Sequence, residues 1–111
     1  MKMVVALIRP EQLPAVKLAL FDAQIPRLTA MNVLGTAPMA EQQMFRGIEK
    51  RVTLFQRVRI EVVLTDALVE KAIEAISKGA METGGHGRIY VLDVHDAVTI
   101  WTGVRGPKAV S

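Results

Sequence analysis

The sequence predicts an α+β sandwich in which two helices cover one face of a four-stranded antiparallel sheet. Two strand–helix–strand units follow one another along the 111 residues, each with an apolar strand, an amphipathic helix and a second strand. A chain of this length forms one compact domain and is too short for two. The resulting order βαββαβ is that of the ferredoxin-like fold.

The first unit begins with a buried strand. The apolar run within Met3–Arg9 predicts this strand, and Pro10 is tolerated in the first turn of the helix that follows. That helix is predicted over Glu11–Gln24 because apolar residues recur there at helical spacing, at Leu13, Val16, Leu20 and Ala23. Pro26 prevents the helix from continuing, and Leu28–Gly35 is predicted as the second strand.

The second unit begins with a half-buried strand. Charged and apolar residues alternate over Arg57–Val63, so one face of this strand packs on the core and the other meets water. Thr65 or Asp66 can cap a helix that runs to about Ser77. Gly79 follows closely and is predicted to end that helix.

The last elements complete the sheet and leave one of its faces bare. Arg88–Val94 is predicted as the fourth strand, and Ala97–Trp101 as a short fifth. Because both helices lie on one face, the apolar residues of the other face stay exposed unless another molecule covers them. The sequence therefore predicts that copies of the chain associate.

The composition describes an aliphatic core without cysteine. Half of the residues are hydrophobic but only 5% are aromatic, so aliphatic residues and methionine must build the core. The absence of cysteine excludes disulfides, thiol nucleophiles and thiolate zinc sites, and it fits a reducing compartment. No apolar run reaches the roughly 18 residues of a membrane span. The N-terminal run is short and lacks a small-residue cleavage site, so we expect a strand rather than a signal peptide, in a cytoplasmic protein.

The net charge argues against a nucleic-acid partner. The chain carries 14 Lys and Arg against 11 Asp and Glu, a net charge of +3. A nucleic-acid binder gathers such an excess on one face, with aromatic residues between the charges. Here the basic residues between Arg46 and Arg59 alternate with Glu49 and Glu61. The charge supports no more than a mild preference for anionic ligands.

Two segments exceed what the fold needs. Thr36 to about Gln56 connects the second and third strands, whereas hairpin loops need only about two to five residues. Thr83–Arg88 has three glycines beside a cation, which can bring backbone N–H groups onto a phosphate. A tight turn between a helix and a strand also uses glycine, and no P-loop or dinucleotide fingerprint is complete here.

Several short motifs resemble those of the P-II signal-transduction proteins. Phe45-Arg46-Gly47-Ile48-Glu49 is similar to part of the T-loop signature of that family. Four further segments of this chain are similar to the family's second signature and to the residues that follow it, namely Thr83-Gly84, Gly87-Arg88-Ile89-Tyr90-Val91, Asp93-Val94 and Thr102-Gly103. The resemblance extends from Met1 to Gly103. It implies one domain over residues 1–111, with a T-loop at about 36–55, a glycine-rich B-loop at about 83–88 and a C-terminal segment at 97–111.

The resemblance implies a trimeric regulator that binds adenine nucleotides between neighbouring subunits. Carried over by position, Thr29 and Val63 would contact the adenine, supported by Leu7, and Gly35 would let the backbone approach. The phosphates would be held by Gly85, His86, Gly87 and Arg88. It implies no catalytic residue and no metal ligand. The output would be a target protein, a membrane transporter or a metabolic enzyme of nitrogen or carbon metabolism, contacted through the T-loop.

Departures from the family pattern bear on which ligand is bound. The glycine loop is about two residues shorter than usual, and His86 replaces its Asp. Thr99 and Trp101 stand where the family has an Arg-x-Arg pair, for which Arg105 could substitute. Each charge-assisted contact contributes roughly 1.5–3 kcal/mol to binding. The loss of two cations should therefore weaken the binding of a triphosphate more than that of a monophosphate, and we expect ADP or AMP to bind at least as well as ATP.

The T-loop departs as well. Pro38-Met39 occupy the place of the Gln that helps to hold magnesium and 2-oxoglutarate, although Arg57 could pair with an oxoacid. The resemblance therefore supports 2-oxoglutarate or bicarbonate as an effector only weakly. Lys50 and Ile48 replace the tyrosine and the serine that some members modify, so control by modification is not expected.

Three other classes share the predicted fold. An acylphosphatase-type enzyme needs an Arg cradle and an Asn, and Arg9 and Asn32 are present without the glycine-rich cradle. His86 and His95 have no evident carboxylate partner that would make either a general base. An RNA-binding module stacks bases on strand aromatics, of which only Tyr90 is offered. A metal-binding trimer of similar fold would need metal ligands at paired spacing, and this sequence has none.

Overall fold

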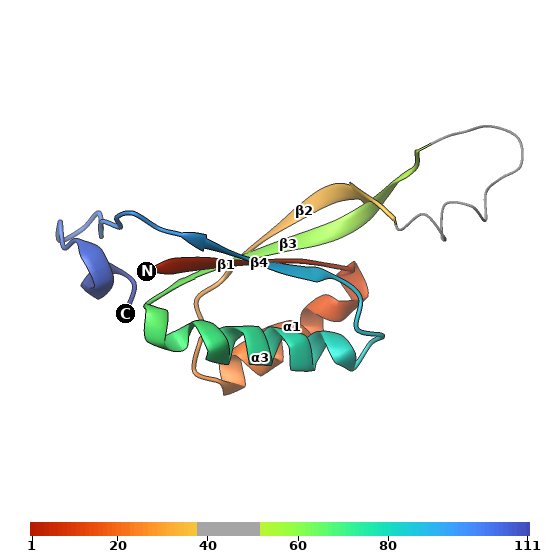
Figure 1. The fold of residues 1–111 in the computed structure, drawn as a ribbon, viewed down its shortest axis with the longest axis horizontal. Helices are drawn as coiled ribbons and strands as arrows, with labels where there is room; N and C mark the ends of the chain where they lie inside the picture. Colours follow the sequence, from red (N-terminus) through yellow and green to blue (C-terminus); the bar gives the residue numbers. More distant parts are fainter. Residues whose placement is uncertain (38–51) are drawn as a thin grey trace, which may run out of the picture.

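The protein is an α+β sandwich, as predicted (Figure 1). The computed structural model describes residues 1–37 and 52–111. Its main elements, in chain order, are β1 (Lys2–Ile8), α1 (Leu13–Asp22), β2 (Thr29–Thr36), β3 (Leu54–Leu64), α3 (Val69–Met81) and β4 (Arg88–Asp93). The four strands form one sheet in the order β2-β3-β1-β4, and every neighbouring pair is antiparallel. Both helices cover the same face of the sheet.

The core lies between that face and the helices. Alternation along β3 buries Val58, Ile60 and Val62 against the helices, and β1 contributes Val4, Ala6 and Ile8. The register pairs Val4 with Val62 and Ala6 with Ile60, so the two strands present their apolar residues to the core together. The alternation of charged and apolar residues in the sequence therefore predicted correctly which side chains of β3 face the core.

The first helix is shorter than its sequence predicts. It starts with a 3-10 turn at Pro10–Gln12 and continues as α1 to Asp22. Gln24 has a left-handed backbone, with φ 63°, which ends the helix before Pro26 is reached. Val16 and Leu20 are fully buried, as their helical spacing predicts.

Gly79 does not end the second helix, contrary to the prediction. After a 3-10 turn at Asp66–Leu68, α3 runs through Gly79 to Met81. A Cβ atom at this position would lie 2.7 Å from Val16 Cα and 2.8 Å from Ala15 O, both in α1. The glycine therefore allows the two helix backbones to approach each other, and its role is in packing rather than termination.

Replacing Gly79 by alanine is expected to destabilise the fold. In an open helix, Gly→Ala gains up to about 1 kcal/mol, but here the methyl group meets α1 backbone that cannot move alone. We expect a loss of about 1–3 kcal/mol in the free energy of unfolding, measured by urea denaturation. Ser77→Ala, on the exposed side of the same helix, is the matched control and should leave the midpoint almost unchanged. A stabilised Gly79→Ala variant would contradict close helix packing.

The structure differs from two further predictions. The fifth strand at Ala97–Trp101 does not form, because pairing there is limited to one bridge between Val98 and Arg105. The long connection is also shorter than predicted, since β2 extends to Thr36 and β3 begins at Leu54. The T-loop motif at 45–49 lies outside the described residues. No helix in the described part of the chain is long and apolar enough to cross a membrane.

Candidate functional site

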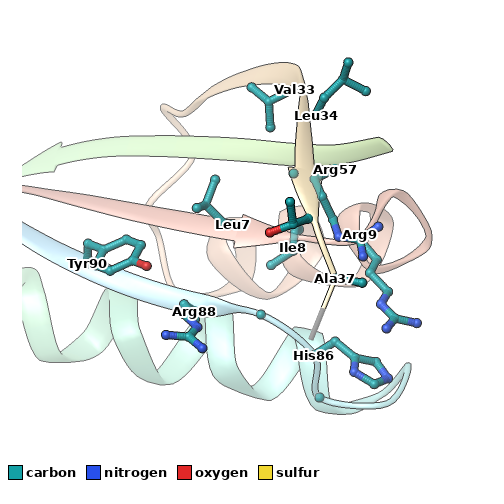
Figure 2. A pocket seen from close by; sticks show the side chains of 14 residues that line it. Leu7, Ile8, Arg9, Val33, Leu34, Ala37, Arg57, His86, Arg88 and Tyr90 are labelled. Carbon is teal, nitrogen blue, oxygen red and sulfur yellow. The ribbon is translucent and has the colours of Figure 1, made fainter. Parts of the chain in front are cut away.

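A cleft of about 660 Å³ lies at one end of the sheet, where β1 ends, β2 ends and β4 begins. The loop between α3 and β4 forms one wall, and the end of β1 through Arg9 forms the other together with Val33–Ala37. Figure 2 shows side chains from these separate segments around the same space. The antiparallel register explains the meeting, because Leu7 pairs with Arg88 on one side of β1 and with Arg59 on the other.

The glycine loop has a backbone that other residues could not adopt. Gly84, Gly85 and Gly87 have φ values of 104°, 70° and 124°. A Cβ atom on Gly87 would lie 2.5 Å from the carbonyl oxygen of Leu7, and one on Gly85 would lie 2.6 Å from Met81 Sδ. Glycine is thus favoured at all three positions by the backbone angles and, at Gly87, also by close contact with β1.

The cleft is lined by positive charge. Arg9, Arg57, His86 and Arg88 all line it, and they come from the end of β1, from β3 and from the loop that leads into β4. None of the described residues that line the cleft is acidic. The Arg57 guanidinium donates a hydrogen bond to the Gln56 carbonyl at 2.8 Å and lies 5.4 Å from the centre of the Phe55 ring. Backbone N–H groups in a left-handed glycine loop, with nearby guanidinium groups, are suited to bind a phosphate or another small anion.

The structure brings most of the predicted nucleotide-binding residues together. The cleft is lined by Leu7, Gly35 and all four loop residues from Gly85 to Arg88. Thr29 and Val63 do not line it. Thr29 pairs with Glu61 and Val63 pairs with Met3, both toward the other end of the sheet.

Sequence reasoning missed several residues of the cleft, and three of them follow a simple spacing. Arg9, Val33 and Tyr90 line it together with the predicted residues. Each stands two positions from a predicted one, namely from Leu7, Gly35 or Arg88. Residues i and i+2 of an extended chain point to the same side, so this spacing was the signal that could have found them. In the described part of the chain, no group of three or more His, Asp or Glu could hold a metal ion.

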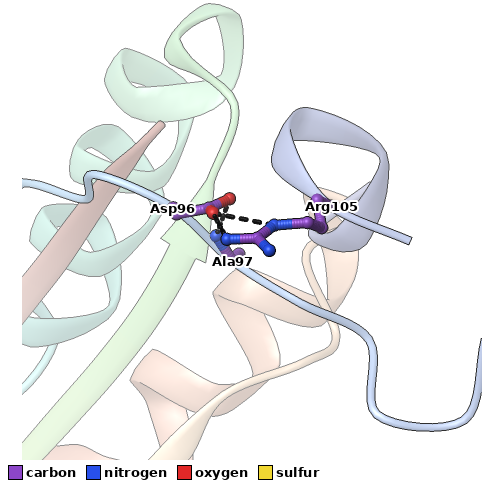
Figure 3. A network of polar contacts seen from close by, with 3 residues as sticks. All are labelled: Asp96, Ala97 and Arg105. Carbon is purple, nitrogen blue, oxygen red and sulfur yellow. Dashed lines mark hydrogen bonds and ion pairs between the residues drawn. The ribbon is translucent and has the colours of Figure 1, made fainter. Parts of the chain in front are cut away.

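The C-terminal segment forms a small loop that is held by hydrogen bonds among its own residues. Thr99 N–H donates to Val104 O at 2.8 Å, and Gly106 N–H donates to Ala97 O at 3.0 Å. Arg105 Nε donates to Asp96 Oδ2 at 3.0 Å, and its Nη2 contacts the same oxygen (Figure 3). The hydrogen bond from Arg105 lowers the pKa of Asp96 below its ordinary value. Arg105, proposed from sequence as a phosphate ligand, is therefore paired with Asp96 and does not line the cleft of its own chain.

The sheet face opposite the helices carries a group of apolar residues, and neither helix covers it. Met3, Val63 and Leu92 lie in one row across it, because Met3 pairs with both of the others. Tyr90 and Leu92 are nearly half exposed. Two charged residues of this face in β3 are paired with each other, with Arg59 Nε 2.9 Å from Glu61 Oε2. This outer sheet face, defined by Met3, Val5, Leu7, Val63, Tyr90 and Leu92, is a candidate interface.

A helix-backed antiparallel sheet with a basic glycine-loop cleft at one end places the chain among small α+β proteins of ferredoxin-like fold. The model of the family described as nitrogen regulatory protein P-II matches residues 1–104. The chain belongs to this family, the P-II signal-transduction proteins of nitrogen regulation, as the sequence motifs predicted. Its relatives in this family are regulatory proteins.

Individual relatives match over almost their full length. The chain is 37% identical to nitrogen regulatory protein GlnK1 of Methanosarcina mazei, over 99% of this chain and 97% of the relative. It is 40% identical to GlnK2 of Haloferax mediterranei, over 98% and 90% of the two chains. The crystal structure of Arabidopsis thaliana PII bound to citrate has a TM-score of 0.78, at 32% identity, over 98% of this chain and 88% of that one.

Proposed function

We propose that the protein is a homotrimeric, cytoplasmic regulator that binds an adenine nucleotide in the glycine-loop cleft and controls a target protein. The observation that carries the proposal is the cleft itself. Three arginines, a histidine and the left-handed glycine loop line it, and none of its described lining residues is acidic. Such a site favours a ligand with several negative charges close together, as in the phosphates of a nucleotide.

A second copy of the chain would complete the site. Within one chain, Thr29 and Val63 lie outside the cleft, yet their register places them on the outer sheet face. Association through that face would put these two residues of one subunit near the cleft of another. The apolar row of Met3, Val63 and Leu92 supports association, and family membership supports the number three.

The charge of the cleft also bears on which nucleotide is preferred. Thr99 and Trp101 supply no cation, and Arg105 is already paired with Asp96. Few cations are thus left to neutralise the additional phosphate of ATP. ADP or AMP should therefore bind at least as well as ATP. Arg57 is available at the cleft for a carboxylate effector such as 2-oxoglutarate, or for bicarbonate. The relative from Arabidopsis, solved with citrate, supports a small polycarboxylate as a further effector.

The target protein would be contacted through the T-loop, of which residues 38–51 lie outside the described part of the chain. The support for this role is the family motif at 45–49 and the position of the loop. Gly35, Thr36 and Ala37 line the cleft and lead directly into it. A ligand that contacts these residues can favour one loop conformation over another, because it interacts with them differently in each. The target is a membrane transporter or a metabolic enzyme.

Calorimetric titration tests the nucleotide proposal, with ATP, ADP and AMP each alone and with 2-oxoglutarate or bicarbonate. Arg88→Ala removes a charge-assisted contact from the cleft and should weaken ADP binding by about 1.5–3 kcal/mol, or roughly 10–150-fold. Arg27→Ala, an exposed arginine outside the cleft, is the matched control and should bind as the unaltered protein does. An unchanged affinity for Arg88→Ala would mean that the glycine loop is only a turn, and a clear preference for ATP would contradict the expected order.

A further inference from the structure

Gln12 is a fully buried polar residue whose side chain joins two walls of the cleft. Its Oε1 accepts a hydrogen bond from Arg9 N–H at 2.7 Å, and its Nε2 donates one to the Ala80 carbonyl at 3.2 Å. Its own N–H donates to Arg9 O at 3.0 Å. The side chain has no exposed surface, and both ends of its amide are satisfied. It therefore ties the residue that follows β1 to the end of α3.

The Ala80 carbonyl also binds the start of the glycine loop. It accepts hydrogen bonds from Thr83 N–H at 3.2 Å and from Gly85 N–H at 2.9 Å. The bond from Gly85, with Gly84 in a left-handed conformation, is the pattern that ends many helices. Gln12 thus holds the same oxygen that fixes Gly85, a residue of the cleft wall.

The opposite end of the Gln12 amide holds Arg9, on the other wall of the same cleft. An aliphatic side chain of similar length would fill the interior without any need for buried hydrogen bonds. A glutamine there adds a fixed distance between two backbone groups, because both of its bonds must be kept once it is buried. The amide therefore acts as a spacer between Arg9 and the glycine loop.

We propose that Gln12 is a positioning residue, which sets the glycine loop at the separation from Arg9 that a phosphate group requires. This inference rests on the proposed binding of a nucleotide in the cleft. Gln12 itself lies behind the cleft wall and does not line the cleft. Its effect on a ligand passes through the backbone positions of Arg9 and Gly85, which it holds directly or through one shared carbonyl.

The test compares ADP with adenosine, which lacks phosphates. Gln12→Met keeps the length of the side chain and removes both hydrogen bonds. It should weaken ADP binding about tenfold, the equivalent of one net hydrogen bond, while adenosine binding stays as in the unaltered protein. Gln56→Met, at an exposed glutamine, is the matched control and should change neither. A merely structural role for Gln12 would weaken both ligands equally, and either that outcome or an unchanged ADP affinity would overturn the proposal.

Amide hydrogen exchange separates this inference from the proposed function, because it needs no ligand. In Gln12→Met, the Gly85 amide should exchange faster than in the unaltered protein, and unchanged exchange would overturn the positioning role. If the unaltered protein does not bind ADP, nucleotide binding fails, but the exchange result still decides the role of Gln12. If the variant does not fold, the unaltered protein suffices: its Gln12 side-chain NH₂ should exchange as slowly as core amides. Exchange as fast as that of exposed Gln56 would overturn the inference.

Discussion

Gly87→Ala is expected to abolish measurable ADP binding while leaving the helices and the sheet in place. The residue has φ 124°, which an L-amino acid adopts only at a cost of about 1–3 kcal/mol. The added Cβ atom would also lie 2.5 Å from the carbonyl oxygen of Leu7 in β1. A strand inside the sheet cannot move away, so the loop must, and its residues leave the positions in which they line the cleft. We expect an affinity loss of more than about a hundredfold, measured by calorimetric titration.

Gly106→Ala is the matched control for backbone strain. This glycine is also left-handed, with φ 76°, but a Cβ atom there would meet nothing within 4 Å. The substitution should therefore cost about 1–2 kcal/mol of stability and leave ADP affinity nearly as it was. Circular dichroism of both variants verifies that the fold persists. If Gly87→Ala binds ADP as well as Gly106→Ala does, the loop conformation seen in the structure is not the one that binds.

The fold could be predicted almost completely from local patterns. The alternation over Arg57–Val63 assigned the correct residues of β3 to the core, and helical spacing identified Val16 and Leu20. The error at Gly79 has a physical reason. Glycine at the end of a helical pattern predicts a cap, yet the same residue also permits close packing, and only the position of α1 decides between the two.

The candidate site could be predicted in part. The glycine loop, Leu7 and Gly35 were found from motifs, and the structure places them around one cleft. Arg9 and Tyr90 were not identified as cleft residues, although the period of two along the strands contains that information. Gln12 could not be found, because it binds a carbonyl 68 positions away in the chain. A contact of that kind depends on tertiary structure, and no local pattern signals it.

Leu92→Glu is expected to convert the proposed trimer into monomers. Leu92 lies in the outer sheet face, where it is adjacent to Met3 and, beyond it, Val63. Its side chain is 44% exposed in the single chain, so a carboxylate can stay hydrated there and the fold of one chain should persist. In an assembly that covers this face, the same carboxylate would be buried without a partner. That burial costs several kcal/mol per charge, and each subunit of the trimer would bear it.

Sedimentation of the Leu92→Glu variant should give the 12.2 kDa mass of one chain, and the unaltered protein should give three times that value. Leu18→Glu, at a more exposed leucine on α1, is the matched control and should remain trimeric because it lies on the opposite side of the molecule from the sheet face. ADP affinity should fall with the trimer in Leu92→Glu, since in the proposed trimer Thr29 and Val63 would contribute to the cleft of a neighbouring subunit. A monomeric variant with undiminished ADP affinity would show that one chain suffices for binding. A trimer that survives Leu92→Glu would place the interface elsewhere.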